Sequence, residues 1–464
     1  MTEHGQRRAW SADRFSNPPL ALAIRPMIAM PDFDPGSAEP WSSVDRFAGL
    51  GFAGGVMSTF DWYHDPENRT RNFSRLREVL AAARAAGIPF HLMDDFAYPS
   101  ATAGGEIVRR NAEHRAKGLF FCLFDGGYFH RIPGGGDFFA DLPQGLLRKV
   151  YLLPLPARDR YEPGAAVEAA FEPWSHACYR IKMPKGDWHV AAFVEREQYE
   201  GTYGDRLNYG LRRLANLLDP AAMESYLDCI HRVYRSELGD LWGKGMPGFF
   251  SEEIETAGVT AGAQTFPSVP WHAGLETDCA RHGFDVYHAL LALFLDDTTP
   301  EGVTLRYRFW HELADRIDAC CLQRIERFCS EQGVAWIGHM IAHDGPYYQI
   351  PFHGPLTRVL RRFHVPGADF IRRGPDVLTS REGGRGPGAK LVASTAWLSC
   401  RADTIAEANA PGDTWQDQRA AFTYHLILGM TIMNTFTWRH WARNPELARN
   451  MNAYAARCAL FLKN

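Results

Sequence analysis

Short apolar segments alternate with stretches of helical periodicity along most of the chain. Segments that predict β-strands recur eight times, at residues 21–30, 51–60, 88–95, 246–253, 334–340, 367–371, 402–407 and 429–438. Between them, apolar residues recur at the spacing of an amphipathic helix, as in the stretch from Phe73 to Gly87. Because eight strand–helix units close most simply on themselves, the pattern predicts a (β/α)8 TIM barrel. A doubly wound sheet is the alternative, although no GxGxxG motif opens a helix.

One long segment interrupts this alternation after the third predicted strand. Between Leu119 and Arg196 the chain is rich in Gly, Pro and aromatic residues, with the strand-like runs LFFCLF, KVYLLPL and WHVAAFV. We therefore expect an inserted β-rich subdomain. The predicted organisation is a first part of the catalytic barrel at 1–118, the inserted subdomain at 119–196 and the remainder of the barrel at 197–464.

Composition narrows the class of protein and its partners. Of the 464 residues, 46% are hydrophobic and 22% are charged, as in an ordinary globular protein with a large core. A formal net charge of −4 without a basic block makes nucleic acid a poor candidate partner. The nine cysteines include no CxxC pair, which favours neither a disulfide framework nor a zinc knuckle. The first residues lack an apolar signal segment and no long apolar run occurs, so we expect a cytoplasmic protein with no membrane partner.

Acidic residues recur at the ends of the predicted strands. Asp94 and Asp95 end the third strand, Glu252 and Glu253 end the fourth, and Glu407 ends the seventh. The carboxyl ends of barrel strands meet at one mouth, where active sites of this fold lie. Glycoside hydrolysis needs two carboxyl groups, one to protonate the leaving oxygen and one to activate water. Capping of helix N-termini is the other explanation for acids in these loops.

Because the fourth and seventh strands lie on roughly opposite sides of a barrel, Glu253 and Glu407 are the predicted catalytic pair. Along a regular strand, Glu252 would point to the face opposite Glu253. We expect the remaining polar and aromatic side chains near the strand ends to bind substrate. These substrate-binding candidates are Asp94, Asp95, Tyr98, His339, His343, Asp344, Tyr347, Trp438 and Arg439.

The chemistry requires no cofactor, but the acids at the mouth could also hold a hard cation. Calcium prefers several oxygen ligands, and the candidates are Asp95, Glu252 and Asp344. A second possibility is a metal-dependent barrel hydrolase that uses His339, His343 and Asp344 as ligands. A third is a non-catalytic barrel that binds carbohydrate without turning it over.

Several segments together resemble one enzyme family. DDFAYPSATAGG (94–105) resembles the D-E-x-x-W-P-S-G-x-A-G-G signature of glycoside hydrolase family 106, the α-L-rhamnosidases, and GFFSEEIE (248–255) resembles its G-F-F-x-D-E-P segment. The other similar segments, in the family's order, are NPPLALAIRP (17–26), GHMIAHDGPYYQIPFHG (338–354) with HVPGADF (364–370), and KLVASTAWLSCRADTIAEANA (390–410).

The resemblance implies a barrel glycosidase with an inverting mechanism and a calcium ion near the site. It places Glu253 on the family's general acid and Glu407 on its general base. The substrate implied is a small oligosaccharide or glycoside that carries L-rhamnose or a similar sugar. The linkage, the aglycone and the oligomeric state are not determined by the sequence.

Overall fold

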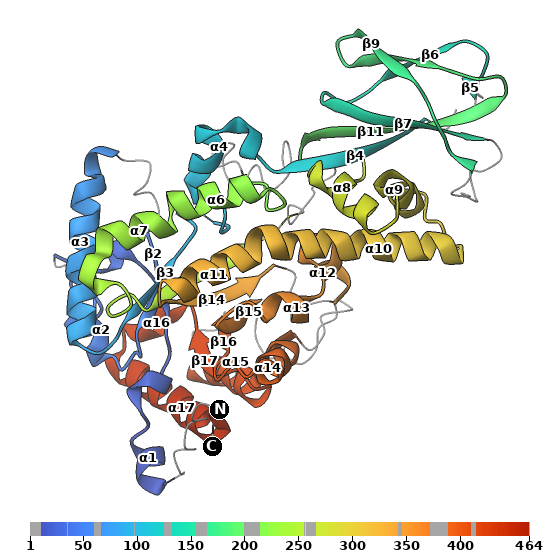
Figure 1. Ribbon diagram of the computed structural model, residues 1–464. Coiled ribbons are helices and arrows are strands. Elements are labelled where there is room, and N and C mark those ends of the chain that lie inside the picture. The colour runs from blue at the N-terminus through green and yellow to red at the C-terminus, as the bar shows by residue number, and fades with distance from the viewer. Residues whose placement is uncertain are drawn as a thin grey trace.

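The computed structural model describes residues 11–34, 36–59, 66–96, 98–124, 132–154, 165–198, 214–254, 256, 266–341, 346–371, 388–409 and 414–463. An eight-stranded parallel sheet, curled into a barrel, is its central element (Figure 1). The strands, in their order around the barrel, are β1 (Met27–Ala29), β2 (Gly55–Ser58), β3 (Phe90–Met93), β12 (Gly248–Ile254), β14 (Ala335–Met340), β15 (Val365–Ile371), β16 (Ile405–Asn409) and β17 (Ile432–Asn434).

The first and last strands come together to close the barrel. The backbone N–H of Arg25 donates to the carbonyl of Met433 at 2.9 Å, and the N–H of Met27 donates to the carbonyl of Thr435 at 2.9 Å. Each of the eight predicted strand segments overlaps one of these strands, so the prediction of a TIM-like barrel is confirmed at this level.

Helices pack around the outside of the barrel (Figure 1). Side chains cap the N-termini of these helices. Asp219, which directly precedes Pro220, accepts a hydrogen bond from the N–H of Ala221, and Thr299 accepts one from the N–H of Gly302. The helices are α1 (Ala12–Ser16), α2 (Val44–Gly49), α3 (Pro66–Ala85), α4 (Glu106–Arg110), α6 (Pro220–Cys229), α7 (His231–Leu238), α8 (Gly274–Arg281), α9 (Val286–Phe294), α10 (Pro300–Ile317), α11 (Gln323–Glu331), α12 (Pro346–His353), α13 (Leu356–Leu360), α14 (Gly388–Leu398), α15 (Trp415–Ile427), α16 (Trp438–Ala442) and α17 (Pro445–Lys463). Among these described helices, none is long and apolar enough to cross a membrane.

Between β3 and β12 the described chain forms antiparallel strands in place of the parallel pattern. One sheet has the order β13-β4-β11-β7-β8, with β5 also paired to β11, and a second has the order β6-β10-β9. The strands are β4 (Lys117–Phe124), β5 (Ile132–Pro133), β6 (Asp137–Asp141), β7 (Leu146–Pro154), β8 (Val167–Glu168), β9 (Phe171–Ser175), β10 (Cys178–Lys182), β11 (Asp187–Glu197) and β13 (Ser268–Trp271). The predicted domain boundaries at 118 and 196 stay a prediction.

β13 is a strand that the sequence pattern did not predict. It comes after the fourth barrel strand, yet Val269 pairs with Leu119 at the edge of the six-stranded sheet. The sheet therefore includes chain from beyond the segment 119–196.

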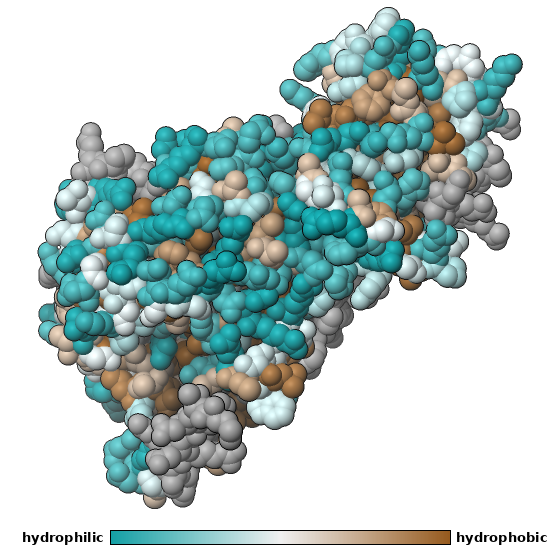
Figure 2. All heavy atoms as spheres, in the orientation of Figure 1, coloured by the Kyte–Doolittle hydropathy of each residue, from teal (hydrophilic) through white to brown (hydrophobic). Residues whose placement is uncertain are grey.

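Side-chain alternation in β11 explains how the antiparallel sheets pack. Val190, Ala192 and Val194 belong to the core shared with the three-stranded sheet. Phe193 faces the other way and contacts the rings of Tyr287 and Phe294 on α9. In Figure 1 this part of the molecule projects from the upper right of the barrel, and Figure 2 shows brown, hydrophobic residues gathered over it. The exposed apolar side chains of these strands are Leu123, Phe139, Leu146, Val167 and Trp174.

A small apolar cluster fills the inside of the barrel below its mouth. It contains one buried residue from each of six strands. Because side chains alternate along a strand, these residues identify which positions of each strand face inward. They are Val56, Met93, Phe250, Ile337, Ile405 and Ile432.

Two predicted elements differ from the observed ones. The strand predicted at 429–438 stops at Asn434, and Trp438 begins α16 instead. The helix predicted over Pro220–Leu238 is interrupted at Ile230, which separates α6 from α7.

Candidate active site

Acidic side chains from several strands point inward at the mouth of the barrel. Met93, Phe250 and Ile405 lie in the inner apolar cluster. Because side chains alternate along a strand, the residues two positions further on face the same way. Those residues are Asp95, Glu252 and Glu407.

Glu252 is the most perturbed of these acids. Its pKa lies well above the ordinary value for a glutamate, first because of burial and then because of the charges of Glu407, Asp95, Glu253 and Asp94. Burial and like charges both disfavour the ionised form of this carboxyl. The mouth therefore holds a carboxyl with a raised pKa close to other carboxyls, an arrangement that acid–base catalysis can use.

A β-bulge changes the direction of the strand next to Glu252. The pairing of β12 with β14 shifts register between Ser251 and Ile254, and Glu253 has a φ of 50°. Regular alternation predicted that Glu252 and Glu253 would point to opposite faces. The bulge breaks that alternation, and Glu253 Oε2 accepts a hydrogen bond from the hydroxyl of Tyr98.

Glu407 is held by a buried histidine. Nε2 of His339 lies 3.1 Å from Oε2 of Glu407, and both side chains are almost completely buried. His339 is two positions beyond the inward-facing Ile337, so alternation along β14 also accounts for its place. The structure thus brings together three predicted site residues, Tyr98, His339 and Glu407, with the bulge at Glu252 and Glu253.

Asp94 lies on the other side of the strands from the mouth. It is 0% exposed, and its carboxylate accepts hydrogen bonds from the hydroxyls of Ser100 at 2.6 Å and Ser251 at 2.5 Å. The hydroxyl of Tyr226 on α6 donates to its carbonyl at 2.8 Å. These contacts give Asp94 a place between the sheet and the helices, although the sequence predicted it as a substrate-binding residue.

Trp438 and Arg439 have internal partners. Trp438 is 0% exposed, its ring packs on Trp41 and Phe47, and its Nε1 donates to the carbonyl of Met27 at 2.5 Å. The ring therefore has no face open for a sugar. Nε of Arg439 donates to Oδ1 of Asp32 at 3.0 Å, so this guanidinium is engaged in an ion pair.

Three predicted residues fall partly or wholly outside the described part of the chain. His343 and Asp344 lie there, and Tyr347 belongs to α12 but its side chain is not among those described. The predicted calcium ligands and the metal-dependent alternative, which both include Asp344, stay predictions.

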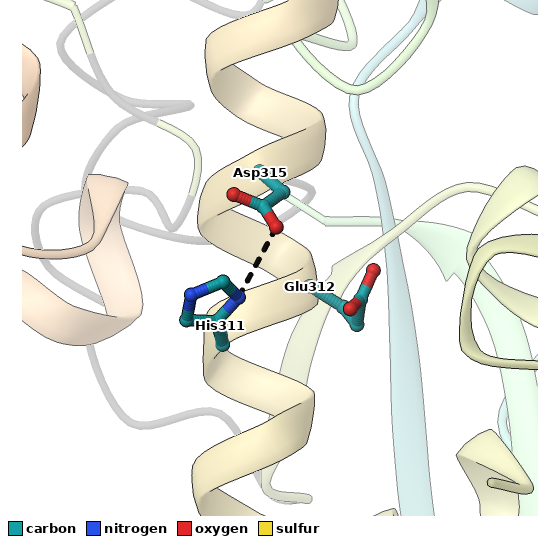
Figure 3. Close-up of side chains that lie close together, drawn as sticks. All are labelled: His311, Glu312 and Asp315. Carbon is teal, nitrogen blue, oxygen red and sulfur yellow. Dashed lines mark ion pairs between the residues drawn. The ribbon is translucent and has the colours of Figure 1, made fainter. Parts of the chain in front are cut away.

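Within the described residues, one group of three possible metal ligands occurs, and it lies on α10, away from the barrel strands. Ligand atoms of His311, Glu312 and Asp315 all lie within 4.8 Å of one another. In Figure 3, His311 and Asp315 point toward each other and Glu312 points to another side of the helix. Asp315 also pairs with Arg358, and Glu312 lies 2.5 Å from Nδ1 of His282. Because Arg358 and His282 already contact these acids, the group is best explained as a set of side-chain contacts on α10.

The comparisons with known proteins support the fold. No protein-family model matches the chain, and no curated protein matches it in sequence. Among solved structures, a rhamnosidase from Novosphingobium sp. PP1Y is similar, with a TM-score of 0.59 and 14% sequence identity over 97% of this chain. The chain spans 60% of the length of that rhamnosidase. Pyruvate kinase from Cryptosporidium parvum matches with a TM-score of only 0.32 and 8% identity, over 94% of this chain and 68% of that chain. The chain therefore has a distant, rhamnosidase-like barrel fold.

Proposed function

We propose that this protein is a glycoside hydrolase, and specifically an inverting α-L-rhamnosidase that acts on a small oligosaccharide or glycoside. The observation that carries the proposal is the cluster of carboxyls at the mouth, Asp95, Glu252, Glu253 and Glu407, in which burial first and then the neighbouring carboxyls raise the pKa of Glu252. A mouth that groups several carboxyls suits a reaction that needs an acid and a base together. The fold likeness to a rhamnosidase supports the same class of enzyme.

In this proposal Glu253 protonates the leaving glycosidic oxygen and Glu407 removes a proton from the attacking water. The hydrogen bond from Tyr98 orients the carboxyl of Glu253. The contact between His339 and Glu407 orients the base. Each acid therefore has a neighbour that limits its rotamers, which positioned proton transfer requires.

The test is hydrolysis of a panel of aryl glycosides, with α-L-rhamnoside included, by the wild type and by Glu253→Gln and Glu407→Gln. Each substitution should lower kcat by roughly 10²- to 10⁴-fold, because positioned acid–base catalysis contributes about that much. Glu331→Gln, at an exposed position near the end of α11, is the matched control and should keep full activity. NMR of the first product anomer should show inversion at the sugar carbon.

Glu252→Gln separates the roles of the two neighbouring acids. If Glu253 is the proton donor, Glu252→Gln should retain more activity than Glu253→Gln, and an activated aryl leaving group should rescue Glu253→Gln most strongly. The opposite order would transfer the donor role to Glu252. Absence of turnover with every glycoside in the panel would overturn the proposed function and favour a barrel that binds sugar without cleaving it.

A further inference from the structure

The bulge that presents Glu252 and Glu253 depends on contacts from the opposite side of the sheet. Residues in the left-handed region pay a steric penalty unless they are glycine, so Glu253 at φ 50° needs surrounding structure to hold it. The contacts that reach this backbone come from Ser100 and, through it, from Asp94.

We propose that Asp94 and Ser100 form a clamp that positions the catalytic bulge, and that Asp94 acts through Ser100 without touching substrate. The catalytic part of this inference rests on the proposed glycosidase function, whereas the structural part does not. The two residues of the clamp lie on the segment that leaves β3, while the bulge lies on β12.

Ser100 forms hydrogen bonds with both backbone polar groups of Glu252, its N–H and its carbonyl. Its hydroxyl accepts the N–H of Glu252 at 2.8 Å, and its own N–H donates to the carbonyl of Glu252 at 2.9 Å. The same hydroxyl donates to Oδ1 of Asp94 at 2.6 Å. The Ser100 hydroxyl has one proton, which it donates to the carboxylate of Asp94. The lone pairs of the hydroxyl oxygen are therefore available to accept the N–H of Glu252.

Asp94 is itself held rigidly. The hydroxyl of Ser251 donates to its Oδ2 at 2.5 Å, and Nε1 of Trp336 donates to the oxygen of Ser251 at 2.7 Å. Nε2 of His231 lies 3.4 Å from Oδ2 of Asp94, and both side chains are fully buried. The backbone N–H of Asp94 donates to the carbonyl of Phe250 at 3.1 Å, which ties β3 to β12 directly below the bulge.

Ser100 and Ser251 allow a matched test. Each donates a hydrogen bond to one oxygen of the Asp94 carboxylate, but only the side chain of Ser100 also bonds the backbone of Glu252. Ser100→Ala should lower kcat by roughly 10- to 100-fold with KM changed less than about 3-fold, since small misplacement of catalytic groups costs about that much. Ser251→Ala removes an equally buried hydroxyl that bonds Asp94 but not the backbone of Glu252, so it should lower kcat clearly less than Ser100→Ala does. Asp94→Asn should resemble Ser100→Ala, and Asp297→Asn, a buried acid at the start of α10, should leave kcat unchanged.

A second measurement is independent of turnover. Hydrogen exchange resolved at the amide of Glu252 should be protected in the wild type and in Ser251→Ala, and at least about 10-fold faster in Ser100→Ala. Equal acceleration in both serine variants, or none in Ser100→Ala, would overturn the clamp. If no glycoside is hydrolysed by the wild type, the proposed function fails and the exchange result still decides whether the clamp exists.

Discussion

Nε2 of His339 lies 3.1 Å from Oε2 of Glu407, and the two side chains are 1% and 3% exposed. In the tautomer that carries its proton on Nε2, the imidazole donates to the carboxylate. A buried carboxylate with such a partner is limited in rotation. We therefore expect His339 to position the proposed base, and its predicted role in substrate binding stays a prediction.

Replacement of His339 should therefore affect catalysis more than substrate binding. We expect His339→Ala to lower kcat by roughly 10- to 100-fold with a small change in KM, because the carboxylate of Glu407 loses its orientation. His339→Gln retains an N–H donor and should recover part of the loss. Steady-state kinetics on the best aryl glycoside measures both values, and a rise in KM at constant kcat would instead assign His339 to substrate binding.

Tyr98→Phe tests the contact on the other acid. The substitution removes the hydroxyl that donates to Glu253 Oε2 and keeps the ring. We expect kcat to fall by about 5-fold, since one hydrogen bond that orients a carboxyl group acting as proton donor is worth about 1 kcal/mol. Tyr454→Phe also removes a hydrogen-bonded hydroxyl, 2.5 Å from Thr423 Oγ1 and away from the barrel strands, and should leave kcat unchanged.

The backbone of Glu253 predicts a reversal of an ordinary stability rule. In a strand, glycine is usually less stable than alanine by about 0.5–1 kcal/mol. At φ 50° the order should invert, so that Glu253→Gly has a free energy of unfolding about 1 kcal/mol greater than Glu253→Ala. Denaturant unfolding of the two variants measures the difference.

Glu172 supplies the control for that comparison. It lies on β9, and it is not among the non-glycine residues with positive φ. Glu172→Gly should therefore be less stable than Glu172→Ala. The same order at both positions would show that Glu253 does not adopt the left-handed conformation in solution.

His91 predicts how stability depends on pH. It is buried on β3, and burial together with the nearby Arg25 lowers its pKa from 6.5 to about 3. Below pH 6.5 the unfolded chain binds a proton at His91, whereas the folded protein does not until about pH 3. The free energy of unfolding therefore falls as the pH falls from 6.5 to about 3. His91 should contribute about 2 kcal/mol of lost stability between about pH 7 and pH 5.

Replacement of His91 with Gln should remove that contribution. Denaturant unfolding at the two pH values should show a smaller loss for His91→Gln than for the wild type, by about 2 kcal/mol. An equal loss in both proteins would mean that the folded state protonates His91 as readily as the unfolded chain does.

The barrel was predictable because its signal is local. Strands such as 334–340 are short apolar runs bounded by polar residues, and the helices between them have their own caps, as at Asp219 and Thr299. β13 had no such signal. Its four residues become a strand because Val269 pairs with Leu119, which lies far away in the sequence.

The candidate site divides in the same way. The sequence by itself determined that acids follow the third, fourth and seventh strands, and the rule that parallel strands share one mouth brought them together. Only the tertiary structure decided which acids face the mouth of the barrel. Asp94 and Asp95 are neighbours in the chain, yet alternation along β3 sends Asp94 to the helices, where it is fully buried against Ser251 and His231.

The bulge at Glu252 and Glu253 could not be predicted from the local sequence pattern. A regular strand would separate the two side chains, and nothing in GFFSEEI marks the place where the register shifts. The shift depends on Ser100, which is 152 residues away from Glu252 in the sequence and 2.8 Å away in the fold. Periodicity along a chain records which faces are apolar, whereas a conformation that is locally unfavourable exists only where distant hydrogen bonds hold it.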